Sequence, residues 1–406
     1  MFETDRTLPR RGFLKIGVGL SAAMLWPRWG WGEIDSPMIT SDRWRRQMAQ
    51  FPEKTDLILL TDRPPQLETP LKYFQKDLTP NEAFFVRWHE AGIPTRVDTN
   101  AFRLEVGGHV DKPLSLSLED LKKNFEPVSV VAVAQCSGNS RSYFQPRVPG
   151  GQWANGAMGN AKWTGVRLRD LLKAAGIKAG AIDVSLQGLD RPPMPDTPVF
   201  AKSITAEHAN DPDVIVAYAM NDADLPMVNG FPLRLIVPGW YATYWVKSLA
   251  HIQVWDKPFD GFWMAKAYRI PADASGNEAP DKLATKTVPI NRMTVRALFV
   301  VPEKDQDVSL GDTLAIQGVA FDYGAGIARV EISTDGGKTW ADAKLENEIG
   351  KYSFRRWRYE WKPAKAGQYA VQCKATNRDG KTQVTEQWNR SGYLRNVIQQ
   401  VNVTVA

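Results

Sequence analysis

The sequence contains little cysteine. Of its 406 residues only Cys136 and Cys373 carry a thiol. Two thiols are too few for a disulfide framework, a four-cysteine zinc site or an iron–sulfur cluster, and neither lies in the CxxCH pattern that attaches haem. We therefore expect no haem in this chain. Any redox cofactor here has to be one that needs few thiolate ligands from the protein.

The sequence also lacks a strong charge of one sign. Lys and Arg number 51 against 45 Asp and Glu, so the net charge is +6. An excess this small is weak evidence for nucleic-acid binding, and we expect no nucleic-acid partner. Half of the excess lies in the first 32 residues, where five basic residues face Glu3 and Asp5.

Long hydrophobic runs are missing as well. The uncharged stretch Ile16 to Trp26 has 11 residues, too few for a membrane span of roughly 20 residues. It follows Arg10-Arg11-Gly12-Phe13-Leu14-Lys15, which resembles a twin-arginine export signal. We expect residues 1–32 to be a signal peptide and the mature protein to be exported folded to the bacterial periplasm, with no membrane span. The alternative is an ordinary basic amphipathic N-terminus.

What is present is enough material for large cores. Apolar residues make up 43% of the chain, which has 15 Trp, and the length predicts two or three domains. After an N-terminal arm over residues 33–80, we expect an α+β domain over residues 81–288. Its pattern indicates buried strands over Val128–Ala134 and Leu233–Val237. Helices are expected after a capping box at Ser117 and over Val166–Ala175.

The composition changes near residue 289, from where we expect an all-β domain to residue 406. Asp335-Gly336-Gly337 is typical of a hairpin turn. The spacing of the strands predicts an immunoglobulin-like sandwich without an inter-sheet disulfide, with Cys373 as a core residue. The expected strands are Thr313–Ala320, Ala328–Ser333, Lys338–Ala341, Tyr352–Trp361, Gln368–Asn377 and Val397–Val405.

The most informative segment surrounds Cys136. A buried strand ends at Gln135, and the chain continues as Cys136-Ser137-Gly138-Asn139-Ser140-Arg141 before a glycine-rich loop. A nearby cation favours the thiolate form of cysteine, and thiolate is a soft ligand for redox metals. The alternative is that Cys136 is a small buried hydrophobe.

This segment resembles the sulfite oxidase family of molybdenum enzymes, whose metal ligand lies in a Cys-x-Gly-Asn-x-Arg motif. The resemblance covers most of the chain after the signal. Further matching segments, in the family's order, are Phe85-Val86-Arg87-Trp88-His89, Gly188-Leu189-Asp190, Asn229-Gly230-Phe231-Pro232-Leu233-Arg234, Val237-Pro238-Gly239-Trp240, Trp245-Val246-Lys247 and Tyr268. The chain departs from the vertebrate pattern at Ser137, Ser140 and Asn229, where that pattern has Ala, Arg and His.

The resemblance implies a molybdenum–molybdopterin cofactor in an α+β molybdopterin-binding domain, with Cys136 as the protein ligand to the metal. It implies a sulfite-binding pocket formed by Arg87, His89, Arg141 and Tyr268, with Trp263 as a wall. The implied cofactor-binding residues are Phe85, Arg87, Asp190, Asn229, Arg234, Trp245, Val246 and Lys247. Without the resemblance, the better interpretation of Arg87 is a cation stacked on Trp88 or Phe84, and that of His89 is a surface residue. Tyr268 and Trp263 would then be aromatic packing residues.

The implied activity is oxidation of sulfite to sulfate, with water as the oxygen source. The electrons would pass to a c-type cytochrome, bound either transiently or as a subunit. The C-terminal domain would form a homodimer. Two alternatives stay open: a periplasmic molybdenum enzyme that reduces methionine sulfoxide, and a cofactor-free secreted binding protein that works through its sandwich domain.

Overall fold

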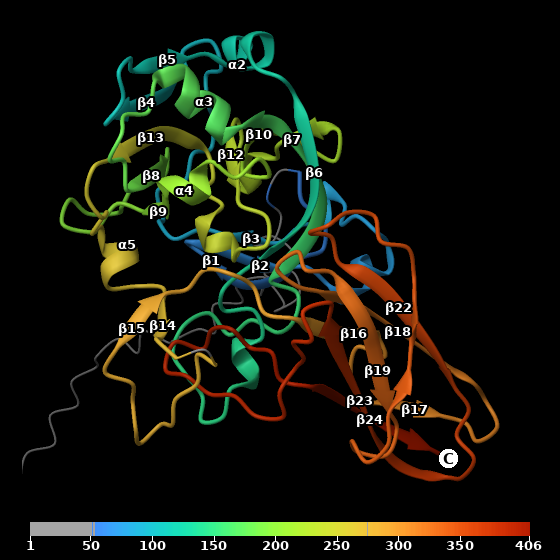
Figure 1. Cartoon of the computed structure of the whole chain (residues 1–406). Helices are drawn as coiled ribbons and strands as arrows, with labels where there is room; N and C mark the ends of the chain where they lie inside the picture. Colours follow the sequence, from blue (N-terminus) through green and yellow to red (C-terminus); the bar gives the residue numbers. More distant parts are fainter. Residues whose placement is uncertain (1–50, 52, 274) are drawn as a thin grey trace, which may run out of the picture. The chain divides into compact units, whose positions relative to one another are not determined.

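The computed structural model describes residues 51, 53–273 and 275–406, which belong to one compact unit (Figure 1). The predicted signal peptide lies outside the described residues, as do positions 33–50 of the predicted arm. Within the described ranges, no helix is both long and apolar enough to cross a membrane.

The described part of the predicted arm forms a small sheet. Strands β1 (Ile58–Asp62), β2 (Pro65–Glu68) and β3 (Val86–Arg87) pair in that order, and Gln66 lies opposite Arg87. The 3-10 helices η1 (Leu71–Gln75) and η2 (Asn81–Ala83) connect β2 to β3. The arm is thus more regular than its weak periodicity suggested, and pairing with β2 fixes Arg87.

Two five-stranded sheets form the body of the first domain, with few and short helices. One sheet contains β6 (Val128–Gln135), β7 (Met158–Arg167), β10 (Ile215–Met220), β11 (Ala223–Asp224) and β12 (Arg234–Ile236). The other contains β4 (Leu104–Gly108), β5 (Leu114–Leu116), β8 (Asp183–Gly188), β9 (Ala201–Thr205) and β13 (Leu249–Trp255). The short elements are α2 (Leu118–Asn124), α3 (Leu168–Ala175), α4 (Ala206–Ala209), α5 (Phe262–Ala265), η3 (Arg141–Tyr143), η4 (Met227–Asn229), η5 (Ala242–Tyr244) and the hairpin β14 (Arg269–Pro271) with β15 (Thr287–Pro289).

The two predicted helices are present, one of them shorter than predicted. The capping box of α2 is confirmed, because Ser117 and Asp120 exchange side-chain to backbone hydrogen bonds. Helix α3 starts at Leu168, so a start at Val166 was wrong. Val166 belongs to β7, where it pairs with Val216, and this sheet contact overrides the helical pattern.

The C-terminal domain consists of two sheets that share one apolar core, to which Cys373 belongs. One sheet has the order β16-β18-β22-β21 and the other β17-β24-β23-β19-β20. An immunoglobulin-like topology stays a prediction. The strands are β16 (Arg296–Val301), β17 (Gln306–Val308), β18 (Leu314–Phe321), β19 (Ile327–Ser333), β20 (Ala341–Asp342), β21 (Lys344–Leu345), β22 (Arg355–Trp361), β23 (Gly367–Asn377) and β24 (Gln399–Val405).

The predicted strand Lys338–Ala341 was wrong. The Asp335 carboxylate accepts hydrogen bonds from the backbone N–H groups of Lys338 and Thr339, so these residues complete the turn. Only Ala341 enters β20. The sequence prediction also omitted β16, which turns out to contact the first domain through Arg296.

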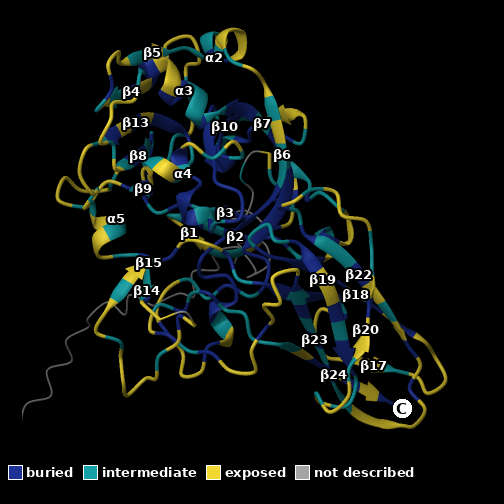
Figure 2. Ribbon diagram, viewed as in Figure 1, coloured by how far each residue is buried: buried dark blue, intermediate teal, exposed yellow. Residues whose placement is uncertain are grey.

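The described residues of the two domains are joined by polar contacts. The Val133 N–H of β6 donates to the Tyr352 carbonyl (2.9 Å), and the Tyr352 hydroxyl donates to Asp213 (2.8 Å). Arg356 donates to Asp77 (2.6 Å). Strand β6 changes from half-buried at Val128 to buried at Gln135 (Figure 2), so it brings the chain from the surface into the interior just before Cys136.

Candidate active site

Cys136 lies at the buried end of β6, in a tight turn. Its N–H donates to the Ala157 carbonyl (2.9 Å), and its carbonyl accepts from the Asn139 N–H (3.0 Å). Ser140 has a left-handed backbone (φ 69°), after which η3 begins at Arg141. Backbone hydrogen bonds therefore fix the position of the thiol independently of any ligand.

Two cavities meet at Cys136. The first has a volume of about 560 Å³, and the second has a volume of about 20 Å³. Arg87, Cys136 and Tyr268 line both cavities, and Cys136 is only 8% exposed. A group bound to the thiol would therefore face both spaces at once.

Glycines enclose Arg141 in the first cavity. A Cβ atom at Gly138 would lie 2.5 Å from Arg141 Nη2, and one at Gly150 would lie 2.7 Å from Nη1. Nη1 donates to the Gly151 carbonyl (3.1 Å), whereas the buried Nε has no hydrogen-bond partner. The guanidinium is therefore held in place with donor capacity left for an anion.

His89, which lines the second cavity, and Tyr268, which lines both, form a hydrogen-bonded pair. The His89 ring stacks on Phe200 at 3.6 Å between centroids. Burial, together with the positive charge of Arg87, holds the pKa of His89 well below 6.5, so its imidazole is neutral. Burial raises the pKa of Tyr268, so its phenol keeps its proton. Both groups thus offer hydrogen bonds without adding charge.

The second cavity is cationic. Of the predicted cofactor-binding residues, Phe85, Asn229, Arg234 and Lys247 line it together with Arg87, and its lining contains no carboxylate. Burial, helped by the charge of Arg234, lowers the pKa of Lys247 to about 7, and burial lowers the pKa of Arg234 to about 9. Asp190 offsets part of the charge of Lys247 from outside the lining. Several buried cations that face one space are still costly, so this cavity suits an anionic ligand.

The donor set fits a pterin cofactor that carries a phosphate. Arg87 Nη1, Arg234 Nε and Thr243 Oγ1 are buried without a hydrogen-bond partner, which leaves donors for phosphate and ring oxygens. Because the second cavity is narrow, its side chains have to separate to admit the cofactor. No group of three His, Cys, Asp or Glu occurs among the described residues, so a metal at Cys136 would take its other ligands from the cofactor.

Four predicted residues line neither cavity. Asp190 is buried after β8, where the charge of Lys247 acts on it. Trp245 donates its Nε1–H to the Val237 carbonyl (2.8 Å), and the adjacent Val246 is buried in the core. Trp263 packs edge-on against His89 at 5.1 Å. Aromatic packing therefore places Trp263 behind the site rather than as its wall.

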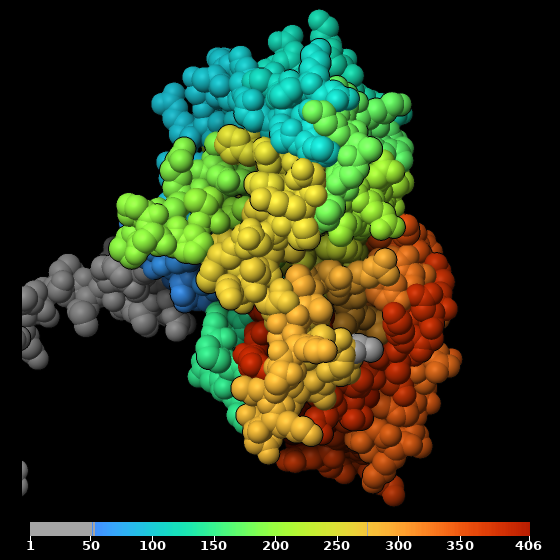
Figure 3. All heavy atoms as spheres, turned by 60° about the vertical axis from the view of Figure 1, so that its left-hand side comes forward, coloured from blue at the N-terminus to red at the C-terminus, as the bar shows by residue number. Residues whose placement is uncertain are grey.

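The sequence analysis missed the contribution of residues 388–394 in the C-terminal domain. The Tyr393 ring lies parallel to that of Tyr268 at 5.5 Å, and the Ser391 carbonyl accepts from Arg141 (3.2 Å). Arg390 forms a bidentate ion pair with Glu278, in which Nε donates to Oε1 (2.9 Å) and Nη2 donates to Oε2 (2.6 Å). Figure 3 shows the segments near residues 145, 280 and 390 side by side. No local motif marks this segment, because its role depends on how the domains pack.

Two lysines were also missed, of which Lys54 is half-buried and Lys202 is buried. Lys54, in the predicted arm, donates to the Phe84 carbonyl (3.0 Å) and to the Asn229 side chain. Burial lowers its pKa to about 7. It therefore supports two neighbours of the second cavity from outside. The other, Lys202, lies beside Tyr268.

Comparisons with known proteins agree with this cofactor chemistry. The family model for an oxidoreductase molybdopterin binding domain matches residues 90–263, and that for a Mo-co oxidoreductase dimerisation domain matches residues 287–406. Mitochondrial sulfite oxidase of Macaca fascicularis is 32% identical over 386 residues, which cover 90% of this chain and 68% of the relative. Sulfite oxidase of Gallus gallus is 32% identical over 361 residues, covering 84% and 77%.

A solved structure shares the fold. The sulfane dehydrogenase SoxCD from Paracoccus pantotrophus aligns with a TM-score of 0.72 at 23% identity, covering 86% of each chain. At this identity the likeness concerns the fold alone. Two family models match the chain, and its sequence is 32% identical to a sulfite oxidase over 90% of its length. These matches show that this protein belongs to the sulfite oxidase family of molybdopterin oxidoreductases.

Proposed function

We propose that this protein oxidises sulfite to sulfate at a molybdenum–molybdopterin centre ligated by Cys136. The observation that carries the proposal is the junction of two cation-lined cavities at one buried thiol. One cavity suits an anionic cofactor, and the other suits a small anionic substrate. The curated relatives named sulfite oxidase support the choice of substrate.

The residues around the first cavity would bind and orient sulfite. Arg87 and Arg141 provide fixed positive charge and free N–H donors for its oxygens. Tyr268 and the neutral His89 donate or accept hydrogen bonds without repelling either substrate or product. Trp263 and Phe200 hold the His89 ring in place.

The residues around the second cavity would hold the cofactor. Arg234 and Lys247 would pair with its phosphate, and Asn229 with Phe85 would contact the ring system. Direct contacts from Asp190, Trp245 and Val246 stay predictions. When bound, the molybdenum cofactor supplies two-electron redox chemistry. Water would provide the added oxygen atom.

The electrons would leave to a separate c-type cytochrome, and the C-terminal domain would form a homodimer. The first proposal rests on the two cysteines, neither of which lies in a haem-attachment pattern. The second rests on the dimerisation-domain match at residues 287–406. The twin-arginine pattern supports a periplasmic location, and the two-sheet core supports an immunoglobulin-like fold for the C-terminal domain.

The test combines metal analysis with a steady-state assay. We expect near-stoichiometric molybdenum in protein from a host that makes the cofactor, and sulfite-dependent reduction of both cytochrome c and ferricyanide. Protein without molybdenum would overturn every molybdenum-enzyme interpretation. Molybdenum-loaded protein that reduces methionine sulfoxide but leaves sulfite unchanged would favour the repair-enzyme alternative.

A further inference from the structure

Lys202 is a buried lysine directly behind the substrate cavity. It lies on β9 and is 0% exposed. Its Nζ donates to the Trp263 carbonyl (2.7 Å), and it lies 4.6 Å from the centre of the Tyr244 ring and 5.1 Å from that of Tyr268. The ammonium group thus lies between two aromatic faces, one of which belongs to a cavity-lining residue.

No carboxylate lies within 4 Å of this ammonium in the described part of the chain. The titratable or charged groups near it are Tyr244 of η5, Tyr268, and Arg269 of β14, and its charge also reaches His89. Helix α5 carries no titratable side chain, and β8 places Leu186 opposite Lys202. On α4, Glu207 is exposed and His208 stacks on Trp240.

We infer that Lys202 is a positioning residue that strengthens anion binding in the first cavity through Tyr268 while its ammonium group is charged. This inference rests on the proposed function, because it assigns the anion to that cavity. The ammonium of Lys202 lies 5.1 Å from the centre of the Tyr268 ring, and Tyr268 lines the first cavity. An anion bound against Tyr268 would therefore be attracted by this charge, which the protein interior screens weakly.

The charge of Lys202 changes near neutral pH. Burial, with a smaller contribution from Arg269, lowers its pKa to about 7. Below this pH the ammonium is charged and attracts the anion, and above it the amine is neutral and the attraction is lost. His89 stays neutral and Tyr268 stays protonated over this range. Anion affinity is therefore expected to fall as the pH rises through neutrality.

The experiment measures sulfate binding to the molybdenum-loaded protein by calorimetry at about pH 6 and about pH 8.5, which bracket the Lys202 pKa of about 7. Sulfate keeps its double charge between these values, so only the protein titrates. We expect Lys202→Met to weaken binding about fivefold to thirtyfold at the lower pH and by less than about twofold at the higher pH. Lys247 also has a pKa of about 7, so the comparison is made with wild type at each pH. Lys202→Arg keeps its charge, so its affinity should fall less than that of wild type between the lower and the higher pH.

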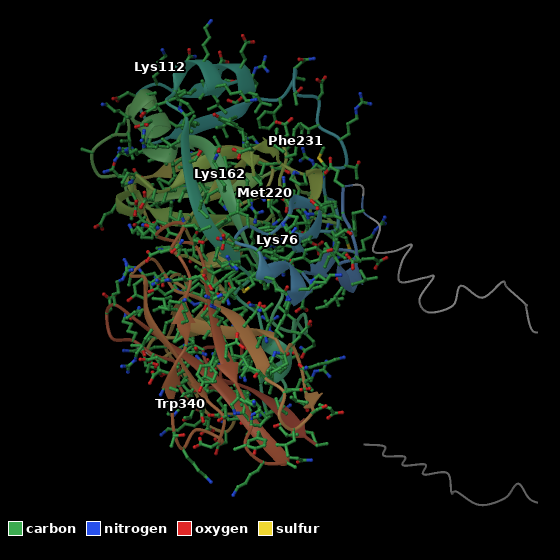
Figure 4. The ribbon with its side chains drawn as sticks, turned by 90° about the vertical axis from the view of Figure 1, so that its right-hand side faces the viewer. Lys76, Lys112, Lys162, Met220, Phe231 and Trp340 are labelled. Atoms are coloured by element: carbon green, nitrogen blue, oxygen red, sulfur yellow. The ribbon has the colours of Figure 1, made fainter. Side chains whose placement is uncertain are left out.

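The matched control is Lys162→Met. Lys162, labelled in Figure 4, forms an exposed ion pair with Asp222 (2.7 Å) and lines neither cavity, so its replacement removes the same charge outside both linings. Equal pH dependence of sulfate binding in wild type, Lys202→Arg and Lys202→Met would overturn the inference. If Lys202→Met fails to fold, the test rests on Lys202→Arg. The inference is then overturned if the ratio of its sulfate affinities at the two pH values equals that of wild type.

The experiments also distinguish an error in the proposed function from an error in the role of Lys202. If wild-type protein loaded with molybdenum binds sulfate with the expected pH dependence but does not turn over sulfite, then the substrate assignment is wrong and the role of Lys202 stands. If the protein turns over sulfite but replacement of Lys202 does not change the affinity for sulfate, then the proposed function stands and the role of Lys202 is wrong.

Discussion

The surroundings of the two cysteines differ in almost every physical respect. Cys136 lies beside cavities lined by cations and by polar atoms without partners. Cys373 is 0% exposed in an apolar core between two sheets, where burial raises its pKa well above 9. The same side chain therefore faces open cavities in one domain and is packed among apolar side chains in the other.

The difference extends from the two cysteines to the residues around them, which suit ligand binding at Cys136 and stability of the fold at Cys373. The C-terminal core consists of apolar side chains that contact one another, and among them Trp357 Nε1 lacks a hydrogen-bond partner. Around Cys136, by contrast, three charged side chains, Arg87, Arg141 and Arg234, keep buried N–H groups without partners. Incomplete satisfaction of buried polar groups marks a site where a ligand is expected to supply the missing partners.

Replacement of Cys136 should have the largest effect. Cys136→Ser should reduce sulfite turnover by about 1000-fold or more and lower the molybdenum content, because a serine hydroxyl is a poor substitute for a soft thiolate. The free energy of unfolding of the metal-free protein should change by less than about 1 kcal/mol, since the backbone holds the turn. Retained turnover would show that Cys136 is not the metal ligand.

Replacement of Arg141 should have the next largest effect. Arg141→Gln removes charge-assisted hydrogen bonds to the substrate, so KM for sulfite should rise about 10- to 100-fold with a smaller change in kcat. Arg147→Gln is the matched control, because Arg147 follows in the same loop but is exposed and bonded to Gln152 (3.0 Å). A loss of thermal stability with unchanged KM would remove Arg141 from the anion pocket.

Replacement of Tyr393 tests whether the C-terminal domain takes part in the site. Tyr393→Leu keeps the apolar bulk but removes the parallel stacking on Tyr268 and the ring beneath Arg141. We expect kcat/KM for sulfite to fall about 3- to 10-fold. Steady-state kinetics measure it, and kinetics equal to wild type would restrict the site to the first domain.

Replacement of Cys373 should leave turnover unchanged. Cys373→Ser buries a hydroxyl among apolar side chains, so the free energy of unfolding should fall by about 1–3 kcal/mol while kcat and molybdenum content stay the same. Denaturant titration and metal analysis measure these quantities. Molybdenum loss in this variant, with the fold intact, would contradict the division between the two cysteines.

The sequence permitted prediction of those site residues that lie in contiguous motifs. Cys136, Arg141 and the Asn229 to Arg234 segment are each adjacent to a recognisable pattern, and the structure places them at the cavities. Tyr393 and Lys202 could not be found in this way, since their roles depend on contacts between distant segments. Trp263 lines neither cavity, and its role as a wall stays a prediction, since an aromatic residue near a site packs behind it as readily as it lines it.

Arg390, Ser391 and Tyr393 line the first cavity, yet they come after every strand of the first domain in the chain. During synthesis, every strand of the first domain leaves the ribosome before this wall exists. A chain ended early by a premature stop would carry Cys136 in a half-open site, however well its first domain had folded. The lining of the first cavity is therefore complete only after Tyr393 has been added to the chain.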